Sequence, residues 1–465
     1  MPGIGGLAVF LMLALASRSL RRPQLVRAGV ILVPCLLTII LAGGTLTNRV
    51  ASINAESHSG GFRIHTWKGV ARMVRHHPVL GTGLGTFEVA YPKYAEVGWT
   101  KLAHNSYLQY AAEGGVVLPI ALVILIGMAV VPAVISLRRR REAEPTCPDW
   151  MPNRSLMISG LLGGAAASMA RNLVDSDWYV AAIGTTFWIV LGAAVALSDR
   201  EATEFPMPVW KHWSKVGTFG LIIAWLISVL MSQYYYTGGW ALLETGDREG
   251  GLRAFRRATR LDPLDADLHR KMGGILRLTS EESGTDIYLR EAERELKRAA
   301  ELEPTAPKSY YQLGRLYENG FRDYDGAVEM FHAALDRDPH ALQVYMALAE
   351  TYEQMGRPAD ALRDYRRIAE MEDSVYERVR AIPELVEPSY IFAREALGRN
   401  AECLGDRTEA VRQYRRALDR IGRYQLSVEK MGPVMEQMGS RDKDLEERIE
   451  ALRRQIESRL KALGA

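Results

Sequence analysis

Long apolar runs fill the first half of the chain, whereas the second half is charged and amphipathic. A helix needs about 17–25 mostly apolar residues to span a bilayer. The pattern predicts six membrane helices, of which the first is short. They cover residues 4–17, 26–43, 115–137, 155–171, 178–197 and 215–236.

The first apolar run has two interpretations. Its Ala-Leu-Ala sequence at residues 14–16 is similar to the cleavage site of a signal peptide. Signal peptides, however, carry their positive charges before the apolar core. Here Arg18, Arg21 and Arg22 follow the core, which favours a membrane helix.

Two basic loops predict the orientation of these helices. Residues 18–27 contain four arginines, and residues 138–141 are four consecutive arginines. Short loops rich in Lys and Arg stay on the cytoplasmic side. Alternation then places the long loop 44–114 outside, together with residues 172–177 and everything after residue 236.

The outer loop contains most of the polar residues of the membrane half. Apolar residues recur at helical spacing from Ile64 to Val74, so we expect a helix over residues 63–76 that stops before Pro78. Glycines 81, 83 and 85 predict a tight turn. A second helix is expected to begin near His104 and to continue into the membrane run at 115.

Residues 232–423 repeat with a period of about 34, the length of a tetratricopeptide unit. Three units have a small residue, a large one four positions on, an Ala three further on, and then a Pro that ends the helix, and two more units match this pattern in part. Small residues let paired helices approach closely. The sets are Gly251/Phe255/Ala258/Pro263, Ala292/Leu296/Ala299/Pro304, Ala327/Phe331/Ala334/Pro339, Ala361/Tyr365 and Ala410/Tyr414/Ala417.

The spacing of apolar residues over 424–465 predicts a final helix with one apolar stripe. The stripe either caps the core of the last repeat or forms a short coiled-coil seam. The predicted organisation is therefore an all-α chain: a polytopic membrane domain over 1–236, about five repeats over 237–423, and this helix. The stripe consists of Leu445, Ile449, Leu452, Ile456 and Leu460.

Charge composition separates the same two parts. Residues 1–240 contain 20 basic and 12 acidic residues and all nine Trp, whereas residues 241–465 contain 38 basic and 43 acidic residues. This distribution excludes a soluble two-domain enzyme and a nucleic-acid binder. Cys35, Cys147 and Cys403 are too few and too far apart for a disulfide framework or a zinc site.

His104 is the strongest candidate for chemistry, because an imidazole at the outer membrane boundary can accept a proton from a hydroxyl. The alternative is a polar interfacial histidine. Four cations on the helix before it suit either a diphosphate or anionic lipid headgroups. They are Arg63, Lys68, Arg72 and Arg75.

Other polar groups give weaker signals. His65, His76, His77 and His104 lack the spacing of metal ligands on one helical turn, so no metal is predicted. The glycine turn lacks the strand that a dinucleotide loop requires. The Asp175-Ser-Asp177 sequence has the spacing of a metal-binding carboxylate pair, but an ion pair between Arg171 and Asp175 explains it more simply.

The loop 63–118 resembles that of the O-antigen ligase and polymerase superfamily. The family loop has an Arg and a Trp one turn apart, a Pro followed by spaced glycines, a Tyr-Pro pair and a His-Asn pair. Leu118 stands where the family usually has a second glycine, and Ser17-Arg18 resembles the end of an upstream family helix. The matching residues are Arg63, Trp67, His77, Pro78, Gly81, Gly83, Phe87, Tyr91, Pro92, His104, Asn105, Glu113 and Gly114.

The resemblance implies an extracytoplasmic glycosyltransferase of the bacterial inner membrane. Its substrates would be a polyprenyl-diphosphate-linked glycan and a hydroxyl on lipid A core, polysaccharide or protein, with no cofactor. His104 and Arg63 would be catalytic. Asn105, Glu113, Lys68 and Arg72 would bind substrate. A protein partner would occupy the repeat groove.

The resemblance covers residues 4–197 and only the C-terminal part of the family's membrane domain. We therefore expect the gene to encode more helices upstream. The alternative function is a membrane-anchored scaffold for cell-envelope or polysaccharide assembly, in which the repeats recruit partners and the membrane helices act as an anchor.

Overall fold

The computed structural model describes residues 58–98, 100–139, 154–198, 209–374, 377, 386–437 and 441–465. These residues form helices and contain no strand, which confirms the all-α prediction. The predicted helices at 4–17 and 26–43, the basic loop 18–27 and Ser17-Arg18 lie outside the described residues. The chain divides into two compact units, residues 1–206 and 207–465.

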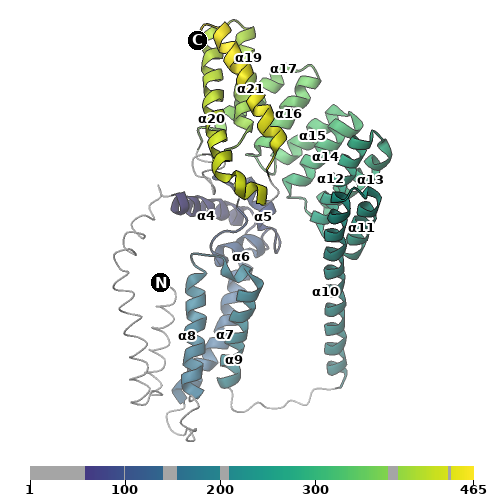
Figure 1. The fold of residues 1–465 in the computed structure, drawn as a ribbon. Coiled ribbons are helices and arrows are strands. Elements are labelled where there is room, and N and C mark those ends of the chain that lie inside the picture. Colours follow the sequence, from purple (N-terminus) through teal and green to yellow (C-terminus); the bar gives the residue numbers. More distant parts are fainter. Residues whose placement is uncertain are drawn as a thin grey trace. The chain divides into compact units, whose positions relative to one another are not determined.

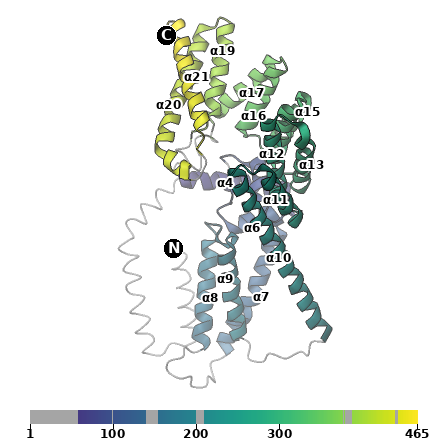
Figure 2. The same cartoon turned by 45° about the vertical axis from the view of Figure 1, so that its right-hand side comes forward.

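In the described part of the first unit, three long helices run side by side, and α4 and several short helices lie at one end of them. Helices α7, α8 and α9 run side by side, and α4 lies across one end of them in both views (Figures 1 and 2). The helices are α4 (His58–His76), α5 (Phe87–Ala90), η1 (Tyr91–Tyr94), α6 (Ser106–Gly114), α7 (Val117–Arg139), α8 (Arg154–Arg171), η2 (Asp177–Tyr179) and α9 (Ala181–Ser198).

Three helices within the described residues are long and apolar enough to cross a membrane. They are Val117–Leu137 in α7, Ala181–Ser198 in α9 and Val216–Glu244 in α10. The run at 155–171 does form α8, but many of its residues are Gly, Ala and Ser, and it is not among the three. It packs against α7 and α9 through Ile158 and Leu162.

The outer loop differs from the prediction at one point. We expected one helix from His104 into the membrane, but the chain breaks between α6 and α7 at Gly115, which has φ 64°. A Cβ atom at Gly115 would lie 2.1 Å from the carbonyl oxygen of Val79. The close approach of the preceding loop therefore requires the glycine and interrupts the helix.

The second unit begins with α10 (Val209–Glu244), a single helix that contains both the last apolar run and the first helix of the repeats. Its last turns pack on α11, where the rings of Tyr236 and Trp240 contact Phe255. The domain boundary expected at residues 236/237 therefore falls inside a continuous helix, and the compact unit begins before it.

The repeats form antiparallel helix pairs, five of them within the described residues. After α10 come α11 (Arg248–Leu261), α12 (Ala266–Ser283), η3 (Asp286–Tyr288), α13 (Leu289–Leu302), α14 (Pro307–Arg315), the π-helical turn η4 (Leu316–Phe321), α15 (Tyr324–Leu335), α16 (Leu342–Gln354), α17 (Pro358–Met371), α19 (Ser389–Cys403), α20 (Arg407–Gln437) and α21 (Lys443–Ala462).

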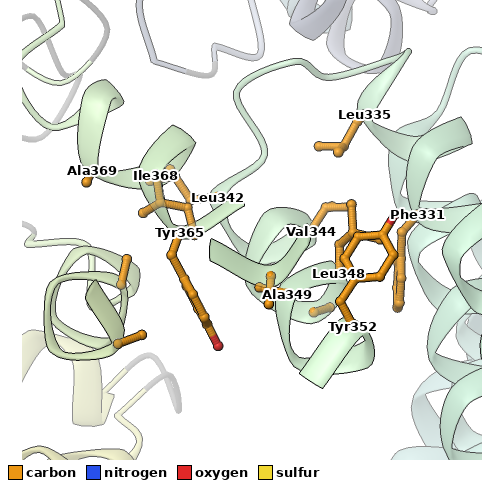
Figure 3. Packing of buried hydrophobic residues seen from close by; sticks show 14 of the residues in the cluster. Phe331, Leu335, Leu342, Val344, Leu348, Ala349, Tyr352, Tyr365, Ile368 and Ala369 are labelled. Atoms are coloured by element: carbon orange, nitrogen blue, oxygen red, sulfur yellow. The ribbon is translucent and has the colours of Figure 1, made fainter. Parts of the chain in front are cut away.

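The core of each pair follows the predicted spacing. Both the large and the small positions of the pattern are buried. Phe331 and Tyr365 are two of the large ones (Figure 3). Glycines on the first helix of a pair leave room for the aromatic ring of the second helix. A Cβ atom at Gly314 would lie 2.4 Å from Phe331, and one at Gly398 would lie 2.6 Å from Tyr414. Close helix contact at small residues therefore sets the register of the repeats.

The C-terminal stripe is covered within the chain. Ile449, Ile456 and Leu460 of α21 are buried in one cluster with Tyr414 and Ile421 of α20. Helix α20 continues to Gln437, past the predicted end of the last repeat at 423. The stripe thus packs against the last repeat of its own chain, as a capping helix does.

The Ala327→Trp substitution is expected to destabilise the repeats by about 1–3 kcal/mol or more, because Ala327 is completely buried between paired helices. Thermal unfolding of the purified chain in detergent, followed by circular dichroism, should show a lower melting temperature. Glu329→Trp, at an exposed position two residues away, serves as the control. Equal melting temperatures would contradict the repeat register.

Candidate functional site

His104 is held in an unusual backbone conformation by contacts on both sides. Its φ of 52° is one of two positive values among the described non-glycine residues. The preceding residue is fixed twice: Trp67 Nε1 of α4 donates to the Ala103 carbonyl at 2.9 Å, and the Ala103 amide donates to Gln109 Oε1 at 3.1 Å. The backbone strain is thus supported by surrounding structure.

The imidazole of His104 lies near the Asp175 carboxylate and feels the charge of Arg63. Its Nδ1 is 3.8 Å from Asp175 Oδ1, beyond hydrogen-bond distance. Among the described residues this buried nitrogen has no hydrogen-bond partner. Burial, and secondly the charge of Arg63, lower the pKa of His104, while Asp175 opposes the shift. The lowered pKa favours the neutral imidazole, the form that can accept a proton.

Asn105 joins α6 to the segment after α8. Its Oδ1 accepts from the Leu108 amide at 3.0 Å and caps α6, while its Nδ2 donates to the Leu173 carbonyl at 2.8 Å. The neighbouring Ser106 hydroxyl donates to Asn172 Oδ1 at 2.6 Å. These bonds join the start of α6 to the segment that follows α8, and they place Asp175 near His104.

Glu113 lies at the opposite end of α6 from His104 and is buried. Its Oε2 accepts from the Gly85 amide at 2.9 Å, and its Oε1 accepts from the Tyr179 hydroxyl at 2.8 Å. Burial, and then this carboxylate, raise the pKa of Tyr179. Glu113 thus connects the glycine turn to η2, the short helix before α9.

Three of the four cations on α4 were expected to be catalytic or to bind substrate, and they have different surroundings. Arg63 is half-buried and acts electrostatically on His104. Lys68 is exposed. Arg72 forms an ion pair with Glu96 and donates to the Tyr94 carbonyl at 2.6 Å. Only Arg63 is brought to His104; Arg72 is engaged in holding the loop.

Sequence reasoning missed the pairing of Asp175 with His104. It identified Asp175 as a partner of Arg171, and that contact exists at 3.8 Å, but the closer partner of Arg171 is Asp177. The available signal was the position of the Asn172–Asp177 segment on the same predicted outer side as His104. Among the described residues, no group of three or more His, Cys, Asp or Glu could hold a metal ion.

The second compact unit, residues 207–465, contains a separate cavity of about 480 Å³ between α17, α19 and α20. Its lining combines arginines with carboxylates and amides, including Arg366, Arg412 and Asn400. Arg394, which also lines the cavity, donates to Glu372 at 2.7 Å and to Gln413 at 3.0 Å. The cavity is therefore lined by both positive and negative groups.

Comparisons with known families agree with both parts of the chain. Residues 3–123, which include Arg63, His104 and Glu113, match a family described as O-antigen ligase. Residues 236–281 and 318–381 match two families described as tetratricopeptide repeat. The chain joins an O-antigen ligase-like part to tetratricopeptide repeats. The resemblance inferred from the outer loop is thereby confirmed.

Solved structures similar to the chain include several of the protein MamA. "Crystal structure of MamA" is 22% identical, with a TM-score of 0.31, and covers 39% of this chain and 93% of that one. "MamA 41-end from Desulfovibrio magneticus RS-1" is 16% identical, with a TM-score of 0.31, and covers 41% and 94%. A comparison with curated proteins finds no match.

Proposed function

We propose that the O-antigen ligase-like part is a membrane glycosyltransferase that uses a polyprenyl-diphosphate-linked glycan as donor. The observation that carries this proposal is the half-buried imidazole of His104, which lies 3.8 Å from the Asp175 carboxylate and whose pKa is lowered by burial and by the charge of Arg63. A base beside a cation suits a reaction in which a hydroxyl loses a proton while a diphosphate gains negative charge.

In the proposed step, the acceptor hydroxyl oxygen forms a bond to the anomeric carbon of the donor sugar. The bond from that carbon to the diphosphate oxygen breaks, and the diphosphate leaves with the electron pair. His104 accepts the hydroxyl proton, and Arg63 stabilises the departing charge. The acceptor is a hydroxyl on lipid A core, a polysaccharide or a protein side chain.

The remaining predicted residues divide by their contacts. Lys68 is exposed on the same helix as Arg63 and retains the proposed binding role. The bonds of Arg72, Asn105 and Glu113 support a role in positioning the loop around His104. Asp175 orients the imidazole and stabilises its protonated form after transfer.

The Asp175→Asn variant tests this arrangement through the pH dependence of glycan transfer. The Asp175 carboxylate raises the pKa of His104, so its removal should lower that pKa further. Because the base must be deprotonated, the acid limb of the rate profile should move to lower pH, together with a lower maximal rate. Transfer of a labelled glycan in isolated membranes measures both.

Glu88→Gln is the matched control, because Glu88 pairs with Lys101 elsewhere in the outer loop. Its acid limb should coincide with that of the unmodified protein. An unchanged acid limb in the Asp175→Asn variant would remove Asp175 from the proposed site.

We also propose that His104 and the repeats lie outside the cytoplasm at the bacterial inner membrane. The two arginine-rich loops support this orientation. In a cysteine-free background, cysteines at Ser57 and Ser283 should react with a membrane-impermeant thiol reagent in spheroplasts, whereas one at Ser136 should not. Labelling of Ser136 alone would reverse the topology.

A second role for the repeats is a scaffold that recruits a protein partner. The polar cavity between α17, α19 and α20 favours it. The cavity lies in the repeat unit, so recruitment is compatible with transfer chemistry in the other unit. Loss of partner binding without loss of transfer in an Arg412→Glu variant would separate the two roles.

A further inference from the structure

The loop that connects α4 to α5 exposes large apolar side chains that the proposed reaction does not use. We refer to residues 78–85 as the apolar loop. Val79, Leu80 and Leu84 are 59%, 77% and 74% exposed. Three such side chains within one short loop form an apolar surface that water solvates poorly, so their exposure indicates a non-aqueous surrounding.

The backbone of the apolar loop is fixed against the end of α6. The amides of Thr82 and Gly83 donate to the carbonyls of Ala112 and Glu113 at 3.1 and 2.9 Å. Gly81 has φ 64°, and a Cβ atom there would lie 2.3 Å from the Glu113 carbonyl. With its inner side occupied by backbone, the loop directs Leu80 and Leu84 outward.

The loop surface is continuous with the membrane helix α7. The Val116 amide donates to the Pro78 carbonyl at 2.9 Å, and Gly115 contacts Val79 through backbone. From there the exposed apolar residues continue along α7. These are Val116, Val117, Ile120, Val123, Ile124 and Met128. Helix α7 is one of the helices that are long and apolar enough to cross a membrane.

A cation lies shortly before the loop. Arg75 is exposed in the last turn of α4, so positive charge stands near the apolar side chains. A segment at a bilayer surface buries its apolar side chains at the boundary of headgroups and acyl chains while its cations contact the headgroups. Charge and apolarity are arranged here in that order.

We propose that the apolar loop inserts Leu80 and Leu84 into the lipid leaflet at the N-terminal end of α7. The occupant of this surface is the bilayer itself. Because the base of the loop is bonded to Glu113 on α6, insertion fixes the depth of α6, and with it the height of His104, relative to the headgroups. The inference rests on α7 spanning the membrane and is independent of the reaction at His104.

Site-directed spin labelling of the full chain in phosphatidylethanolamine/phosphatidylglycerol vesicles tests the proposal. Cys35, Cys147 and Cys403 are replaced by Ser, and a nitroxide is attached to cysteine at Leu80 or Leu84. Oxygen concentrates in the acyl region, whereas a polar nickel complex stays in water. Power saturation therefore reports whether each label lies in lipid.

Both loop labels should show a higher ratio of oxygen to nickel accessibility than a label at the exposed Lys93 of η1. The ratio at both loop positions should be closer to that of a label at Met128 than to that of the label at Lys93. Met128 is exposed on the apolar face of α7. Circular dichroism checks that each labelled chain keeps its helices, and the two loop positions report independently.

Three outcomes would overturn the proposal. Nickel accessibility at both loop positions equal to that of Lys93 would place the loop in water. Low accessibility to both reagents would mean that protein, such as a second copy of the chain, covers it. A lipid-like signal at Met128 without one at Leu80 and Leu84 would show that α7 spans the membrane while the loop stays outside.

Discussion

The His104→Ala variant is expected to lose glycan transfer by about 10²–10⁴-fold, the contribution of a positioned general base. An acceptor hydroxyl is a weak nucleophile near neutral pH, and the lowered pKa of His104 favours the neutral imidazole that can take its proton. The measurement is transfer of a labelled polyprenyl-diphosphate glycan in membranes that contain the protein as expressed from its gene.

His76→Ala is the matched control, because His76 is an exposed histidine at the end of α4. Its transfer rate should equal that of the unmodified protein. Protein level and membrane insertion should be unchanged in both variants. A His104→Ala variant with an unaltered rate would remove the catalytic assignment and favour the scaffold function.

The Glu372→Ala variant is expected to lower the stability of the last repeats by about 3–5 kcal/mol, as removal of one partner from a buried ion pair does. The Glu372 side chain is 8% exposed and binds two guanidinium groups, those of Arg394 and Arg420, which are 5% and 11% exposed. The carboxylate connects α19 and α20 to the end of α17. Without it, the buried Arg394 loses its carboxylate partner, and Arg420 keeps, among the described residues, only Glu377 as an ion-pair partner at 3.6 Å.

Hydrogen exchange of the full chain in detergent, read from peptides of α19 and α20, measures this loss. Glu370→Ala is the control, because that side chain is 68% exposed and its pair with Arg367 lies at the surface. Equal protection of α19 in the two variants would show that the buried network does not stabilise these repeats.

The helical nature of both parts of the chain was accessible from the sequence, because it depends on near neighbours. Apolar runs of membrane-spanning length predicted α7, α9 and the apolar part of α10. The spacing of Ala327, Phe331 and Ala334 predicted a helix face that the structure buries. Such patterns repeat within one or two helical turns, so they can be read without knowing what packs on them.

The outer loop was identified by its motif, and that motif selected the candidate residues, but their contacts were not predictable. Arg63 and Arg72 lie on one helix and have the same charge, yet only Arg63 acts on His104, whereas Arg72 binds Glu96. That difference depends on which loop folds back over α4. No local spacing encodes it.

Only the tertiary structure determined how the residues around His104 are arranged and where one helix ends and the next begins. Asp175 reaches His104 because Asn105 and Ser106 bond to the segment after α8, far along the chain. The break at Gly115 exists because the backbone of Val79 occupies the space beside it. The sequence by itself determined the helices, the repeats and the candidate residues, since short-range periodicity specifies them. Long-range packing, which brings distant backbone and side chains together in three dimensions, determined which candidates meet.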